Sequence, residues 1–101
     1  MPPSRVKLDL SIPEFLDDWF RLTKEDAEQL RQALSRLHRM TWEQVYCSKG
    51  LHWEKIYSTQ AAGSLPLYSM RITIKFRAIV RRDGNCLRFA SLHPDHDSAY
   101  H

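Results

Sequence analysis

The sequence predicts an α+β domain in two layers, with N-terminal helices packed on a small C-terminal antiparallel sheet. Three patterns support this prediction. Leucines recur at helical spacing over residues 23–40, apolar and polar side chains alternate over residues 67–91, and Asp83-Gly84 is a two-residue hairpin signal. The chain has 101 residues, which suffice for one hydrophobic core and are too few for two. We therefore expect a single domain over residues 1–101.

The first half of the chain is expected to be mainly helical. Thr23 can cap a helix that extends to Met40, and the leucine stripe of this helix would cover one face of the sheet. Thr41 and Gln44 fit a capping box, so a short second helix is expected there, with Gly50 as its C-terminal cap.

Other segments of the first half are less regular. Residues 6–10 alternate and could form an edge strand, and the apolar cluster of residues 15–20 could form a helical turn. Residues 53–58 could form a further strand. All three tryptophans precede the sheet, and we interpret them as packing between helices and sheet rather than as ligand-stacking residues: Trp19, Trp42 and Trp53.

Alternation in the second half assigns side chains to the two faces of the sheet. Ile72 and Ile74 are expected on the core face of their strand. A turn centred on Asp83-Gly84 places Arg82 opposite Asn85, and the same register pairs Phe76 with Ser91 on the core face. Arginines then gather on the open face, namely Arg71, Arg77, Arg81 and Arg88.

The formal net charge of +3 conceals an uneven distribution. Residues 1–66 carry nine Lys or Arg and nine Asp or Glu, which cancel. Residues 67–92 carry six Lys or Arg against Asp83 alone, which gives +5. A basic block of this kind attracts a polyanion or an acidic protein segment, although a solvated basic face is the plainer interpretation.

The last nine residues contain three of the five histidines, together with a tyrosine: His93, His96, Tyr100 and His101. With Asp95 and Asp97 they offer metal-ligand types, but their spacing lacks the rigid helical geometry of known zinc motifs. A solvated polar tail is another alternative. A third interpretation joins tail and sheet, because histidine and tyrosine can move protons while guanidinium groups hold a phosphate, which is what RNA cleavage without a metal requires. No metal or other cofactor is expected.

Several classes of protein are excluded at this stage. Cys47 and Cys86 form no CxxC pattern, so a zinc finger is not expected and reduced thiols are the simplest assumption. No apolar run approaches the ~18–20 residues that span a bilayer, and residues 1–5 do not begin a signal peptide. We expect a cytoplasmic protein with no membrane partner.

The segments Tyr68–Ile72 and Phe76–Val80, the hairpin that follows, and the final residues Ser98–His101 resemble the RelE/ParE superfamily of bacterial type II toxins. The resemblance covers mainly residues 67–101. Members are small basic proteins inhibited by a cognate antitoxin. The RelE, YoeB and HigB branches cleave mRNA in the ribosomal A site, whereas the ParE branch acts on DNA gyrase.

The resemblance also implies roles for individual residues. Arg77 matches the phosphate-stabilising arginine of the family, Arg71 matches a basic strand position, and Tyr100 falls where the RNase branches carry a catalytic tyrosine. His101 stands beside it, as in branches whose tail ends in paired His and Tyr. The RelE branch has two lysines where this chain has Ser69 and Arg71, so the candidates for the general base become His93 and His96. Independently of the resemblance, further phosphate contacts are expected from three other cations of the basic block: Lys75, Arg81 and Arg88.

Three functions follow as hypotheses. The first is a ribosome-dependent mRNA endonuclease, held inactive by a cognate antitoxin that covers the arginine face. The second is a ParE-type inhibitor of gyrase, which would need no acid–base residues. The third is a toxin-fold module that binds RNA without cleaving it, its arginines only neutralising phosphates.

Overall fold

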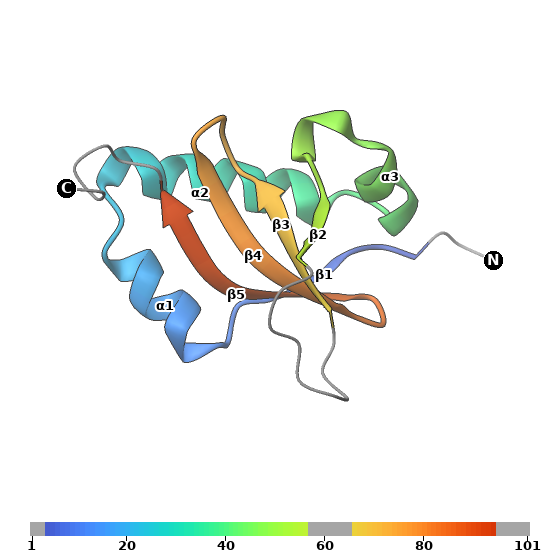
Figure 1. The fold of residues 1–101 in the computed structure, drawn as a ribbon, viewed down its shortest axis with the longest axis horizontal. Coiled ribbons are helices and arrows are strands. Elements are labelled where there is room, and N and C mark those ends of the chain that lie inside the picture. The colour runs from blue at the N-terminus through green and yellow to red at the C-terminus, as the bar shows by residue number, and fades with distance from the viewer. Residues whose placement is uncertain (1–3, 57–65, 95–101) are drawn as a thin grey trace.

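One mixed sheet organises the molecule in the computed structural model, which describes residues 4–56 and 66–94 (Figure 1). Within these residues the strand order is β1-β5-β4-β3-β2. Neighbouring strands are antiparallel except β1, which pairs in parallel with β5. This strand is the edge strand that the alternation of residues 6–10 indicated as a possibility. The strands are β1 (Lys7–Asp9), β2 (Glu54–Ile56), β3 (Leu67–Arg71), β4 (Phe76–Asp83) and β5 (Cys86–Pro94).

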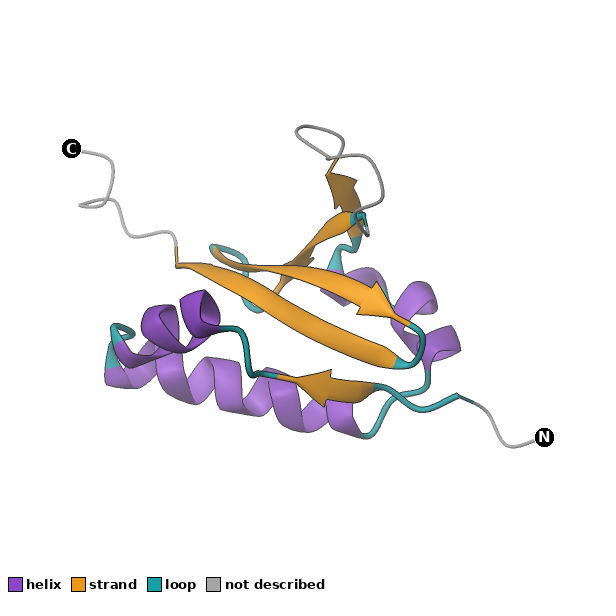
Figure 2. Ribbon diagram, turned by 90° about the horizontal axis from the view of Figure 1, so that it is seen from below, coloured by secondary structure: helices purple, strands orange, loops and turns teal. Residues whose placement is uncertain are grey.

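Helices α1 and α2 lie on one side of the sheet, so the predicted two-layer α+β architecture is confirmed (Figure 2). Thr23 caps α2, its hydroxyl accepting from the backbone N–H of Asp26 at 3.1 Å. Thr41 and Gln44 form the predicted capping box of α3. The helical elements are α1 (Pro13–Phe20), α2 (Lys24–His38), α3 (Trp42–Cys47) and the 3₁₀ turn η1 (Lys49–Leu51).

Two predictions about chain reversals are wrong in detail. Gly50 does not end α3, because the helix stops at Ser48 in extended conformation and Gly50 lies inside η1. Ile74 is 80% exposed rather than part of the core face, since it lies in the turn between β3 and β4. The N–H of Ile72 donates to the carbonyl of Phe76 across this turn at 2.7 Å, which reverses the chain before Ile74 can join a strand.

The β4–β5 hairpin differs from the expected register at its turn. Asp83 pairs with Cys86, so the two-residue loop is Gly84-Asn85 and the predicted pairing of Arg82 with Asn85 is wrong. Gly84 has a positive φ of 60°, which places glycine at the first loop position, as a type II′ hairpin requires. The shift is by two residues in total, so it leaves the assignment of side chains to faces unchanged near the turn.

A β-bulge further along β5 does change the faces. Val80 pairs with Phe89 but Ile79 pairs with Ser91, so Ala90 is an extra residue in β5. Beyond it the alternation is reversed, and Ser91 lies on the open face, contrary to the prediction that pairs it with Phe76 on the core face. The bulge lets Phe89 and Leu92, three positions apart, both be buried.

The core lies between α1, α2 and the covered face of the sheet. Phe15 of α1 is fully buried and its ring centroid lies 5.4 Å from that of Phe89 on β5. Trp42 is buried, while Trp19 and Trp53 are partly buried and pack against the same core, so the packing interpretation of the tryptophans is confirmed. None of the helices in the described ranges is long and apolar enough to cross a membrane.

Candidate functional site

The open face of the sheet carries a row of three polar side chains on neighbouring strands. Arg71 of β3 pairs with Arg77 of β4, and Arg77 pairs with His93 of β5. Directly opposite residues have Cβ atoms about 4.5–5.5 Å apart, so the three side chains leave the sheet side by side. Arg77 and His93 are exposed and Arg71 is half-buried. We call Arg71, Arg77 and His93 the arginine–histidine row.

The described residues give the two arginines of the row no compensating negative charge. Like charges placed directly opposite one another destabilise a sheet. In the described residues no carboxylate lies within ion-pair distance of Arg71 or Arg77. The Nε of Arg71 is also covered and has no hydrogen-bond partner in this part of the chain. An anion placed over the row would relieve the repulsion and supply acceptors.

Ser91 holds the imidazole of His93. Ser91 Oγ and His93 Nε2 share a hydrogen bond of 2.8 Å along the same face of β5. One ring nitrogen is thereby engaged by a neighbour, which orients the ring and leaves Nδ1 as the other proton-carrying position. Sequence reasoning missed Ser91 because regular alternation places it in the core. The available signal was the spacing of the apolar residues Phe89 and Leu92. Regular alternation places residues three positions apart on opposite faces, so burial of both indicates a β-bulge between them.

The other two predicted arginines of the open face form a second cross-strand pair. Arg81 pairs with Arg88, but here the charge is compensated. Arg88 Nε lies 2.8 Å from Asp9 Oδ2, and its NH2 group lies 3.4 Å from Asp83 Oδ2. Hydrogen bonds from Ser11 and from Arg88 lower the pKa of Asp9 to about 2. The same contact with Asp9 raises the pKa of Arg88. Arg88 therefore joins β1 to β5.

Two more cations of the basic block lie away from the row. Arg82 faces the helices, and its Cζ lies 4.1 Å from the ring centroid of Trp42. Its Nη1 donates to Tyr46 Oη at 2.9 Å and its Nε to the carbonyl of Gly84 at 2.8 Å. These contacts make Arg82 a structural link between the hairpin and α3. Lys75 is exposed in the turn between β3 and β4, next to the end of the row.

Comparison with solved structures identifies this architecture. The chain is similar to a chain in the crystal structure of an archaeal RelE–RelB complex from Pyrococcus horikoshii OT3. The match has a TM-score of 0.57 and 21% sequence identity, and it covers 92% of this chain and 96% of that chain. The chain has a RelE-like fold. No protein-family model matches the sequence, and no curated protein matches it significantly.

The RelE-like fold thus includes the helices as well as the strands from which the resemblance was drawn. His93, predicted as part of a polar tail, is instead the penultimate residue of β5 and is held in the sheet. The remaining tail candidates lie outside the described residues: His96, Tyr100 and His101, as well as Asp95 and Asp97. Among the described residues no three His, Cys, Asp or Glu side chains are grouped to hold a metal ion.

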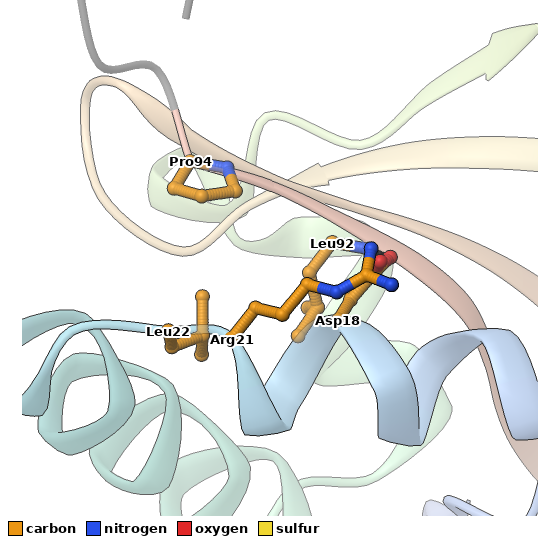
Figure 3. A pocket seen from close by; sticks show the side chains of 5 residues that line it. All are labelled: Asp18, Arg21, Leu22, Leu92 and Pro94. Carbon is orange, nitrogen blue, oxygen red and sulfur yellow. Dashed lines mark hydrogen bonds between the residues drawn. The ribbon is translucent and has the colours of Figure 1, made fainter.

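A small hollow lies at the C-terminal end of β5, on the side of the sheet that the helices cover. Its volume is about 180 Å³, and it is lined by Asp18, Arg21, Leu22, Leu92 and Pro94 (Figure 3). Asp18 Oδ2 accepts a hydrogen bond from the backbone N–H of Leu92 at 2.9 Å, so α1 fixes the end of the strand. Leu92 and Pro94 flank His93 in the strand, and alternation sends the imidazole to the opposite face. The hollow and the arginine–histidine row therefore lie on opposite faces of the sheet, and the hollow is not part of the row.

Proposed function

We propose that this RelE-like protein is the toxin of a type II toxin–antitoxin pair and cleaves mRNA on the ribosome without a metal, in the cytoplasm. The observation that carries the proposal is the arginine–histidine row, in which two guanidinium groups with no ion pair among the described residues lie beside an oriented imidazole. The fold adds support, since the similar archaeal structure is a RelE bound to RelB. We expect a cognate antitoxin to cover the row in this protein.

The chemistry assigns a task to each member of the row. The ribose 2′-hydroxyl loses a proton and attacks the adjacent phosphorus, and the bond to the 5′-oxygen breaks as that oxygen gains a proton. The products are a 2′,3′-cyclic phosphate and a free 5′-hydroxyl. Arg77 and Arg71 hold the non-bridging oxygens, on which negative charge increases in the transition state.

His93 carries one of the two proton transfers. Its exposed imidazole stands directly opposite Arg77, within reach of a phosphodiester bound there. Histidine is suited to this task because it exchanges a proton near neutral pH. The second proton carrier comes from the tail candidates His96, Tyr100 or His101. A positioned acid or base contributes ~10²–10⁴-fold to the rate.

The row is organised before RNA arrives, which is how a protein stabilises developing charge most effectively. Strand pairing fixes the backbone positions from which Arg71, Arg77 and His93 project, and the Ser91 hydrogen bond orients the imidazole. Loss of one such preorganised donor costs about 3–4 kcal/mol of transition-state stabilisation.

Expression in cells with mapping of mRNA 5′ ends tests the proposal. Wild type should arrest growth and produce codon-phased cuts, and Arg77→Ala should abolish both. Arg36→Ala is the matched control, because Arg36 is an exposed arginine of α2, the helix on the other side of the sheet. It should behave as wild type.

Two other outcomes would contradict the nuclease. Growth arrest with intact mRNA and damaged DNA would favour the gyrase inhibitor. Growth arrest with intact mRNA, accompanied by RNA binding, would favour a non-catalytic RNA-binding module. In that case substitution of His93 should leave the arrest unchanged, and substitution of Arg77 should abolish it. Absence of toxicity would contradict the toxin assignment altogether.

A further inference from the structure

Arg81 lies on the same face and the same strand as Arg77, further along β4. Alternation places Arg77, Ile79 and Arg81 on one face, and each strand residue advances the chain by about 3.3 Å, so the two arginines leave the sheet roughly 13 Å apart. The layer between them is uncharged, since Ile79 pairs with Ser69 on one side and Ser91 on the other. The face therefore has two cationic positions separated by a neutral strip.

Within the described residues Arg81 has no ion-pair partner, whereas the neighbouring Arg88 has two. Arg88 is engaged by Asp9 and Asp83. Arg81 has no ion pair among the described residues, and its Nε is covered without a hydrogen-bond partner there. Arg71, at the other end of the face, has the same property. In the part of the chain that the structure describes, a covered guanidinium Nε thus lacks a hydrogen-bond partner at both ends of the strip.

A single-stranded nucleic acid matches this arrangement. Its charges are spaced along an extended backbone and are separated by neutral sugars and bases, whereas a single phosphate or a short acidic side chain has only one charged group. A strand whose phosphate lies over the arginine–histidine row and which runs along β4 would present another phosphate near Arg81. Its intervening sugar would lie over Ile79, which is half-buried and apolar.

Resting on the proposed function, we infer that Arg81 forms a second phosphate position, which fixes the direction and register of the RNA strand without taking part in bond cleavage. Arg88 is not part of it. Arg81 is thus a positioning residue, and its loss should raise KM for cleavage while leaving kcat nearly unchanged.

Binding of oligonucleotides of increasing length tests the inference. The probe is a set of fluorescent 2′-deoxy oligothymidylates from two to five nucleotides, which cannot be cleaved because they lack the 2′-hydroxyl. Anisotropy titrations at several salt concentrations should show a step in affinity once the strand reaches Arg81. Arg81→Gln should remove the step, weaken the longest probe roughly threefold to tenfold, and reduce the salt slope by about 0.7.

Arg36→Gln, which removes the same charge from the helix side, should keep the step and the slope. A step that persists in Arg81→Gln, or no binding by wild type, would overturn the inference. Its failure is distinguishable from failure of the nuclease, because the probes measure binding alone. If the step in affinity depends on Arg81 while mRNA stays intact in cells, the proposed nuclease activity is contradicted and the second phosphate position at Arg81 still stands.

Discussion

Two pairs of arginines face each other across neighbouring strands on one sheet face, and their surroundings differ. Arg81 and Arg88 meet between β4 and β5, where Asp9 and Asp83 neutralise Arg88. Arg71 and Arg77 meet between β3 and β4 with no carboxylate beside them in the described residues. Cross-strand repulsion is therefore relieved in one pair and kept in the other. A like-charge pair that a fold retains is a candidate for binding an anion, whereas an arginine held by two carboxylates, such as Arg88, is part of the scaffold and leaves only Arg81 of its pair to bind an anion.

The largest expected effect comes from removing the uncompensated charge. Arg77→Ala should lower the single-turnover rate of mRNA cleavage on isolated ribosomes by ~10²–10³-fold, because a preorganised guanidinium at the phosphate is lost. The free energy of unfolding in urea should stay the same or rise slightly, since repulsion from Arg71 is removed. A variant that loses activity only in proportion to lost stability would contradict the distinction between the two pairs.

A smaller effect is expected from the residue that orients the imidazole. Ser91→Ala removes the hydrogen bond to His93 Nε2 and should lower kcat on ribosomes by roughly tenfold, below the ~10²–10⁴-fold that a proton carrier itself contributes. The pH profile of kcat should change shape, whereas a purely structural substitution would lower it uniformly. Ser91→Thr keeps the hydroxyl and should restore most of the rate with the wild-type profile.

The compensated pair should respond in the opposite way. Arg88→Gln breaks the ion pairs to Asp9 and Asp83 and should lower the unfolding free energy only slightly, because the pairs are partly exposed to solvent. Its cleavage rate, measured well below the unfolding midpoint, should remain close to that of wild type. A loss of cleavage comparable to that of Arg77→Ala would show that Arg88 itself serves the substrate and would contradict its structural assignment.

The smallest effect is a pH dependence at the same pair. The folded-state pKa of Asp9 is about 2, and an aspartate in an unfolded chain titrates near ~3.9. Because the folded value is depressed, the stabilisation is complete above pH ~4 and is lost as the pH falls toward about 2. Urea unfolding of wild type and Asp9→Asn from pH 6 to pH 2 should show a stability difference that is constant at first and then shrinks. A difference independent of pH would contradict the assignment.

Local signals in the sequence were sufficient for the starts of α2 and α3, whereas they indicated no more than a helical turn where α1 lies. Thr23 and the Thr41–Gln44 capping box mark helix starts through contacts within three residues, so no knowledge of the rest of the chain is needed. The gathering of Arg71, Arg77 and Arg81 on one face also follows from alternation within two strands. The turn position was missed because Asp83-Gly84 and Gly84-Asn85 are both plausible hairpin loops, and the choice depends on pairing along the whole hairpin.

By itself, then, the sequence determined the two-layer class, the capped helices and an arginine-bearing sheet face, all of which rest on short-range periodicity. Only the tertiary structure decided which arginines of this face have a carboxylate partner among the described residues. Asp9, far from Arg88 in sequence, reaches it through the parallel pairing of β1 with β5. The tertiary structure also decided the place of His93. The core buries both Phe89 and Leu92, which requires an extra residue in β5 at Ala90. The extra residue reverses the alternation beyond it and brings His93 opposite Arg77.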